Sequence, residues 1–222
     1  MLPTEAKWIG EVLGKIESAA LSPVLELGSS TPDFRRHQQP YIYELIDRPL
    51  AERGIKFIHC DSKADVGIDI SGNIFDRDVQ AKMRAIAPRC ILCCNIFEHV
   101  TDRRAFAAIC DSLLEPLAYL LVTVPRSYPL HPDPIDTYFR PTPAGIHALF
   151  PGYELLESAV VCGASYGSQL MSKPAALPRT LWSIVKNLLR PRRSREWLVL
   201  NHRLLWTCRR YKVSAALMRK RP

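Results

Sequence analysis

Long hydrophobic runs are missing from this sequence of 222 residues. Its apolar stretches, such as residues 116–125, end well before the roughly 18–20 residues that a membrane-spanning helix needs. The pattern of a signal peptide is also missing from residues 1–20, where Glu5, Glu11 and Glu17 interrupt the apolar residues. We therefore expect the protein to be made and kept in the cytoplasm.

A zinc-binding pattern is missing too. The chain has seven cysteines, but no second Cys/His pair stands at zinc spacing from the C-x-x-C motif of Cys90 and Cys93. Cys90, Cys93, Cys94 and Cys110 fall within apolar runs, which is typical of free thiols in a reducing compartment. We predict buried thiols and no bound metal, and a metal or redox role for the C-x-x-C pair is the less favoured interpretation.

The segment VLELGSSTPDF, residues 24–34, has only one of the glycines that a dinucleotide-binding loop requires. Gly28 is present, but Ser30 and Pro32 stand where further glycines would let a pyrophosphate approach the backbone, which argues against a nicotinamide or flavin. A tight turn into a helix can still form, because Thr31 is a good N-cap and Pro32 suits the first helical position. The segment therefore predicts a site for a cofactor without phosphate, or an ordinary turn that binds nothing.

The charge is divided unevenly along the chain. Residues 173–222 contain 14 Lys or Arg and one Asp or Glu, a formal charge of +13, whereas residues 1–172 carry −5 of the total of +8. We expect an α/β domain over residues 1–172, a basic amphipathic helical insertion over residues 173–208, and a last strand with a basic tail over residues 209–222. The two parts should face different partners.

Five short apolar runs alternate with longer polar segments before residue 126. Runs that are apolar on both faces are typical of parallel strands covered by helices on both sides, and ligands bind at the carboxyl ends of such strands. We also expect helices over residues 4–20 and 142–150, and strands over residues 153–161 and 211–218. The five runs are SPVLELG, IKFIHCD, DVGIDI, RCILCCNIF and LAYLLVTVP.

Over residues 20–165 these motifs resemble the class I S-adenosylmethionine-dependent methyltransferases. VLELGSS is similar to that family's first motif, CDSK and GIDISGNIFD to its ribose and adenine loops, and CCNIFEHVTD to its fourth-strand motif. The segment after the fifth run, VPRSYPLHPDPIDTYFRPTPAGIHALF, resembles a type 11-like subgroup of this family. The resemblance implies a doubly wound, mostly parallel seven-stranded sheet of the Rossmann-like methyltransferase fold, with an antiparallel last strand beside the fifth, and S-adenosylmethionine as cofactor. The cofactor-binding residues that it implies are Glu26, Gly28, Ser29, Ser30, Asp61, Asn73, Asn95 and Ile96.

Methyl transfer needs alignment and exclusion of water, and no nucleophilic side chain. His131, in the proline-rich segment after residue 125, is the predicted base or substrate-orienting residue, and Asp136 could orient it. Arg140 could pair with Asp136 or bind an anionic substrate, while Glu98 and His99 could touch ligand or only support the turn. Histidines and aspartates beside prolines can also merely cap turns. The histidines that we expect to be solvated or packed are His37, His59, His147 and His202.

Residues 179–206 combine leucine and tryptophan with clustered arginines. This composition suits a helix at an anionic membrane surface, at the inner membrane face, and equally a helix packed on the domain with a basic rim. Nucleic acid is less favoured, because no nucleic-acid-binding motif accompanies the arginines. The predicted function is methyl transfer to a small-molecule acceptor, such as a sugar or lipid-linked hydroxyl. The alternative is a cofactor-poor relative that acts as a binding or scaffold module, and the oligomeric state stays open.

Overall fold

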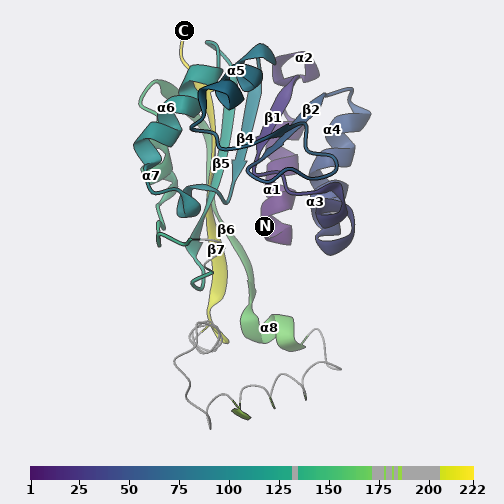
Figure 1. Cartoon of the computed structure of the whole chain (residues 1–222). Helices are drawn as coiled ribbons and strands as arrows, with labels where there is room; N and C mark the ends of the chain where they lie inside the picture. Colours follow the sequence, from purple (N-terminus) through teal and green to yellow (C-terminus); the bar gives the residue numbers. More distant parts are fainter. Residues whose placement is uncertain (132–134, 172–177, 179–181, 183–184, 187–205) are drawn as a thin grey trace.

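The computed structural model describes residues 1–131, 135–171, 178, 182, 185–186 and 206–222. Its centre is a seven-stranded sheet in the order β3-β2-β1-β4-β5-β7-β6 (Figure 1). Strands β1 to β5 are parallel, and β7 is antiparallel to both of its neighbours. This confirms the predicted fold, with the last strand beside the fifth. The strands are β1 (Val24–Leu27), β2 (Phe57–Asp61), β3 (Ile70–Ser71), β4 (Cys90–Cys94), β5 (Tyr119–Ser127), β6 (Tyr153–Ser165) and β7 (Arg210–Lys220).

The two faces of the sheet bury separate hydrophobic clusters. Successive side chains of a strand point to opposite faces, so Leu25 and Leu27 of β1 enter one cluster and Val24 enters the other. In β4 the same alternation divides Cys93 from Cys90. The seven cysteines are free. Because Cys90 and Cys93 face opposite sides of the sheet, this C-x-x-C pair cannot form a joint metal or redox site.

Helices cover both faces (Figure 1). One face packs against α1, α3, η2 and α4 through apolar residues such as Ile9, Ile42 and Leu50, and the other packs against α5, α6 and α7 through Met83 and Phe106. The elements of the first group are α1 (Pro3–Gly14), α2 (Ser18–Leu21), η1 (Phe34–Gln38), α3 (Pro40–Ile42), η2 (Tyr43–Asp47) and α4 (Arg48–Glu52). The remaining elements are α5 (Arg77–Ala85), η3 (Phe97–His99), α6 (Arg103–Leu113), α7 (Pro143–His147) and α8 (Tyr166–Met171).

The N-terminal helix is shorter than the sequence predicted. We expected one helix over residues 4–20, but α1 ends at Gly14 and a separate turn, α2, begins at Ser18. Glu17, between them, has extended backbone angles of φ −61° and ψ 141°, which break the helical path. None of the helices in the described ranges combines the length and apolar composition that a membrane-spanning segment requires.

Strands β6 and β7 continue past the rest of the sheet as a long antiparallel pair and end near α8 (Figure 1). Both are longer than the predicted strands at residues 153–161 and 211–218. Because β6 runs parallel to β5 and β7 runs against it, the end of β6 and the start of β7 lie at the edge where β5 ends. Most of the predicted basic insertion, residues 173–208, lies outside the described residues. The insertion follows β6 and α8 and precedes β7, so its two attachment points lie at the carboxyl edge of the parallel strands.

Candidate functional site

A cavity of about 360 Å³ opens at the carboxyl ends of β1, β2 and β4. Four residues from the predicted cofactor set, Gly28, Asp61, Asn73 and Ile96, line this cavity. Parallel α/β sheets bind ligands at this edge, and the volume lies within the range of about 300–1,000 Å³ that is usual for small-molecule sites. The sequence motifs, which lie on four separate segments, are therefore brought together by the sheet.

The cavity has a polar side and an apolar side. Asp61 and Asn73 supply acceptors, whereas Phe75, Phe106 and Met83 supply an apolar wall. A carboxylate can accept two hydroxyl hydrogen bonds, and flat rings and a thioether suit a planar base. The arrangement can hold a nucleoside with its sugar hydroxyls toward Asp61.

The turn after β1 has left-handed backbone at two residues, Gly28 with φ 66° and Ser30 with φ 56°. A Cβ atom at Gly28 would lie 3.0 Å from Cδ1 of Ile96, so this position has little room for a side chain. Thr31 caps the following turn as predicted, because its Oγ1 accepts the backbone N–H of Phe34 at 3.2 Å. The backbone N–H of Ser30 donates to Oδ2 of Asp61 at 3.0 Å. The turn therefore forms without the second glycine.

Pro32 points away from the nucleoside-sized cavity. It lines a separate cavity beside α4, and its ring packs so closely against Gly67 that a Cβ atom there would collide with it. Neither Ser30 nor Pro32 is among the residues that line the cavity at the ends of β1, β2 and β4. The two replacements of glycine leave that cavity open.

Arg35, which no sequence motif singles out, holds the turn from the opposite side. Its Nη1 donates to the carbonyl oxygens of Ser29 at 2.9 Å and Ser30 at 2.8 Å, and its Nε pairs with Oδ2 of Asp47 at 3.1 Å. Arg35 is only 4% exposed. Burial and the nearby Glu26 raise the pKa of Asp47 to about 6, against the lowering effect of Arg35. A buried ion pair therefore holds the Ser29–Ser30 backbone.

Glu26 lies on the same side of the sheet as Arg35, away from the cavity. Its Oε2 lies 2.8 Å from Nδ1 of His59 on the neighbouring strand. We expected His59 to be solvated or packed, but it has a specific partner, because parallel register places it directly beside Glu26. This pairing joins β1 to β2 next to the turn. A direct contact of Glu26 with a cofactor stays a prediction.

Asn95 ends β4 in a left-handed conformation with φ 55°. Its Nδ2 donates to Oε1 of Glu5 at 2.8 Å, and Thr123 of β5 donates its hydroxyl to the same oxygen at 2.6 Å. Glu5 is fully buried, and its Oε2 accepts the backbone N–H of Leu2 at 3.0 Å. Glu5 thus ties α1 to the ends of β4 and β5, a role that only the fold reveals.

The proline-rich segment after β5 places His131 beside Asp136. The His131 backbone N–H donates to Oδ2 of Asp136 at 3.2 Å, and His131 Nδ1 lies 3.3 Å from the same oxygen. Arg140 donates two hydrogen bonds to Asp136, from Nη1 to Oδ1 at 3.1 Å and from Nη2 to Oδ2 at 2.6 Å, which confirms their pairing. Burial opposes ionisation of Asp136, but the hydrogen bonds from Arg140, Tyr138 and His131 outweigh it and lower the pKa of Asp136. Asp136 is therefore an ionised group that orients the His131 ring.

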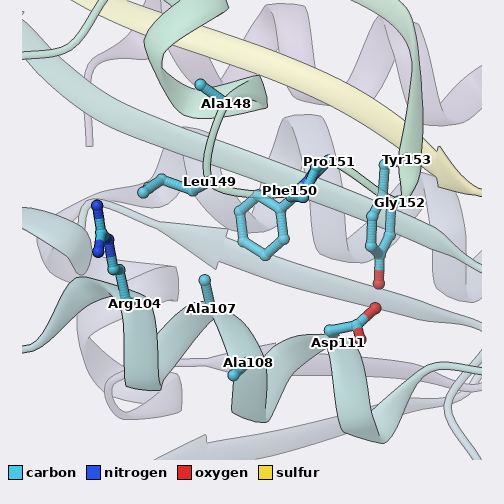
Figure 2. A pocket seen from close by; sticks show the side chains of 10 residues that line it. All are labelled: Arg104, Ala107, Ala108, Asp111, Ala148, Leu149, Phe150, Pro151, Gly152 and Tyr153. Atoms are coloured by element: carbon cyan, nitrogen blue, oxygen red, sulfur yellow. The ribbon is translucent and has the colours of Figure 1, made fainter.

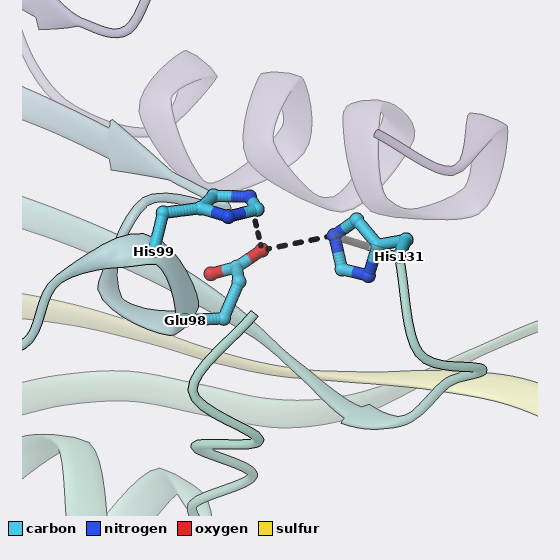
Figure 3. Close-up of side chains that lie close together, drawn as sticks. All are labelled: Glu98, His99 and His131. Atoms are coloured by element: carbon cyan, nitrogen blue, oxygen red, sulfur yellow. Dashed lines mark ion pairs between the residues drawn. The ribbon is translucent and has the colours of Figure 1, made fainter. Parts of the chain in front are cut away.

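Glu98, in η3, points toward the rings of His99 and His131 (Figure 3). Its Oε1 lies 3.7 Å from His99 Nε2 and 3.8 Å from His131 Nε2. Thr137 holds the loop to η3, because its backbone N–H and its hydroxyl both donate to the carbonyl oxygen of Glu98. His99 also lines the cavity described above. The His131 loop and the cavity therefore meet at η3.

A further cavity of about 360 Å³ lies between α6 and the segment from Ala148 to Tyr153 (Figure 2). Its side chains include Arg104 and Asp111 from α6, with Phe150 across from them. None of the residues implied by the methyltransferase resemblance lines it. This cavity lies on the helical flank of the sheet and not at its carboxyl edge.

Three solved structures with similar folds are described as methyltransferases. A protein from Galdieria sulphuraria described as a sarcosine dimethylglycine methyltransferase has a TM-score of 0.50 at 14% identity and covers 98% of this chain and 85% of its own. Coclaurine N-methyltransferase bound to N-methylheliamine and SAH has a TM-score of 0.53 at 11% identity, covering 97% of this chain and 72% of its own. An S-adenosylmethionine-dependent methyltransferase from Archaeoglobus fulgidus has a TM-score of 0.50 at 13% identity, covering 97% and 94%. No family model and no curated protein sequence matches the chain. At these identities the likeness establishes the Rossmann-like methyltransferase fold.

Proposed function

We propose that the protein transfers a methyl group from S-adenosylmethionine to a small-molecule acceptor. The observation that supports this most strongly is the cavity in which Gly28, Asp61, Asn73 and Ile96 meet at the carboxyl edge of a methyltransferase-type sheet. These residues fit the nucleoside. Asp61 already accepts the backbone N–H groups of Ser30 and Lys63 and the hydroxyl of Ser62, so the remaining lone pair of its Oδ2 would accept a ribose hydroxyl. The wall around Phe75 would hold the base.

The bound sulfonium would supply an activated methyl group, and the chain's own residues would align the acceptor and exclude water. The rigid turn held by Arg35 and the Glu5–Asn95 pair sets the ends of β1 and β4 beside the cavity. His131, oriented by Asp136, is placed to orient an acceptor or take its proton. Catalytic roles of His131 and Asp136 are part of this proposal.

The acceptor that we favour is a hydroxyl on a sugar or a lipid-linked molecule. Aromatic rings lie beside His131: Tyr128 is 5.2 Å away between ring centroids, and Tyr211 lies 4.9 Å from Tyr128. Trp206 and Tyr166 extend this cluster toward the attachment points of the basic segment. Aromatic rings suit the apolar faces of such acceptors, and the arginines of residues 179–206 would attract an anionic membrane surface at the inner membrane face.

Calorimetry with S-adenosylmethionine and with S-adenosylhomocysteine tests the cofactor. We expect micromolar binding that Asp61→Ala abolishes, while Asp65→Ala, an exposed acid on the next turn, leaves it unchanged. Circular dichroism of both variants shows whether the fold is kept. No heat at millimolar ligand would refute the proposal and favour the alternative, a methyltransferase-fold protein that serves as a binding or scaffold module.

Flotation with anionic liposomes tests the membrane surface separately. The intact chain is compared with a variant in which the arginines between residues 190 and 195 are changed to glutamine. Loss of flotation in the variant alone supports membrane attachment through the basic segment, because clustered arginines carry the attraction to anionic lipid. Equal recovery of the two proteins would remove this part of the proposal and leave the cofactor test unaffected.

A further inference from the structure

We propose that Glu98, His99 and His131 bind a divalent first-row transition-metal ion beside the nucleoside cavity. The three side chains come from η3 and from the loop after β5, and each offers one ligand atom within 4.8 Å of the others. Two imidazoles and one carboxylate that leave further positions open are a donor set for Fe²⁺, Mn²⁺, Co²⁺ or Zn²⁺. The sequence alone predicted no metal, because His131 lies more than thirty positions from Glu98 and His99.

The burial of Glu98 supports a cation site. The residue is fully buried, and within the described part of the chain neither carboxylate oxygen has a hydrogen-bond partner. Buried carboxylates are ordinarily paired or bound to a cation, since an isolated buried charge costs much free energy. Turn capping cannot explain Glu98, because its side chain caps nothing and only its backbone carbonyl oxygen anchors Thr137. A cation is the partner that this carboxylate lacks.

The two imidazoles are also oriented as metal ligands are. Nδ1 of His131 faces Asp136, and Nδ1 of His99 bonds to the carbonyl oxygen of Ile135. Both Nδ1 atoms thus have acceptors, which favours the tautomer with the lone pair on Nε2. Both Nε2 atoms face Oε1 of Glu98, as Figure 3 shows. Histidine ligands of metals are held in this way, with the second nitrogen bound to a carboxylate or a carbonyl group.

The distances between the three ligand atoms leave room for an ion. Oε1 of Glu98 lies 3.7 and 3.8 Å from the two Nε2 atoms, too far for hydrogen bonds. Metal bonds of about 2.0–2.2 Å place neighbouring ligand atoms about 3.0–3.5 Å apart, and the three ligand atoms lie within 4.8 Å of one another, so side-chain shifts of about 1 Å would complete the site. The His99 and His131 side chains are 22% and 27% exposed, so an ion can reach them from solvent.

The position of the metal site beside the cavity suggests that the ion activates the acceptor, an inference that rests on the proposed methyl transfer. His99 belongs both to the metal cluster and to the cavity wall, so an acceptor hydroxyl bound to the ion would lie next to the cofactor. The ion would lower the pKa of that hydroxyl, whose proton passes to solvent water. The oxygen then bonds to the methyl carbon as the carbon–sulfur bond breaks, and the electron pair stays on sulfur. His131 would act as a ligand in this scheme.

Titration with Co²⁺ tests the site directly. Full-length protein is stripped with EDTA, dialysed and titrated with Co²⁺ while its visible absorption is recorded. We expect one ion per chain in the wild-type protein and no saturable binding in Glu98→Gln or His131→Gln. His37→Gln, at an exposed histidine, should bind as the wild type does. Asp136→Asn should bind about 10–100-fold more weakly, since it removes the group that orients His131.

Thermal unfolding separates lost binding from lost folding. In EDTA, Glu98→Gln should melt at or above the temperature of the wild type, because the substitution breaks no hydrogen bond of the buried Glu98 side chain. Added Co²⁺ should raise the melting temperature of the wild type and leave that of Glu98→Gln unchanged. Absence of Co²⁺ binding in the wild type, or equal binding by Glu98→Gln, would overturn the metal site. S-adenosylmethionine binding measured in EDTA decides the proposed function independently.

Discussion

The backbone N–H of Ser30 donates a hydrogen bond to Oδ2 of Asp61, with 3.0 Å between the two atoms. Ser30 stands where nucleotide-binding loops usually have a glycine, and Asp61 is the acid expected to bind a ribose. The bond therefore links the turn after β1 to the acid at the end of β2. It uses a backbone group, so it does not depend on the serine side chain.

Ser30→Gly should leave cofactor binding almost unchanged. Ser30 has a φ of 56°, a conformation that costs a residue with a side chain about 1 kcal/mol, and glycine removes that cost but loses more entropy on folding. We expect a change in the free energy of unfolding below about 1 kcal/mol, measured by urea denaturation. Calorimetry should give an affinity for S-adenosylmethionine within about threefold of the wild type. A gain of tenfold or more would mean that the serine side chain obstructs the site.

Gly28→Ala should weaken cofactor binding and destabilise the fold. The new Cβ atom would lie 3.0 Å from Ile96 Cδ1, at a residue with φ 66°. Left-handed backbone and the crowded contact together should cost about 2 kcal/mol of unfolding free energy. Ile96→Ala in the same chain removes both crowding atoms, Cδ1 and Cγ1, and should recover part of the affinity. If Gly28→Ala binds S-adenosylhomocysteine as the wild type does, the cavity is not the cofactor site.

Arg35→Met should destabilise the protein by about 3 kcal/mol, because it leaves Asp47 buried without its cationic partner. It also removes both donors to the carbonyl oxygens of Ser29 and Ser30, so we expect weaker cofactor binding. Arg36→Met is the matched control. Arg36 is exposed and stacks on the ring of Tyr43, and its loss should cost less than about 1 kcal/mol. Equal effects of the two variants in urea denaturation would disprove a special role for Arg35.

The sheet was predictable from the sequence because it depends on pattern. Runs that are apolar on both faces predicted parallel strands, and the four motifs of the methyltransferase resemblance placed Gly28, Asp61, Asn73 and Ile96 at one edge, where they do line a common cavity. The antiparallel last strand also lies where the resemblance placed it. Thr31 capped its turn as expected, since capping is a local property of the chain.

The supporting contacts were not predictable because they join residues far apart in sequence. Glu5 reaches Asn95 across 90 positions, and Glu26 reaches His59 across 33. Periodicity assigns a side chain to a face of a strand or helix but does not choose its partner across the sheet. The same reason hid the approach of His131 to Glu98, which depends on how Thr137 docks the loop on η3.

Asp47→Asn should change how stability depends on pH. Burial and Glu26 raise the pKa of Asp47 from its ordinary value of 3.8 to about 6, so the folded state binds the proton more tightly than the unfolded state. This contribution to the free energy of unfolding is about 3 kcal/mol. It is present in full below about pH 4 and is lost as the pH rises through about 6. The wild type should therefore lose stability relative to Asp47→Asn between about pH 4 and pH 7 in urea denaturation. Asp65→Asn, at an exposed acid, should follow the wild type over the same range. A difference between wild type and Asp47→Asn that stays constant with pH would show that Asp47 ionises normally beside Arg35.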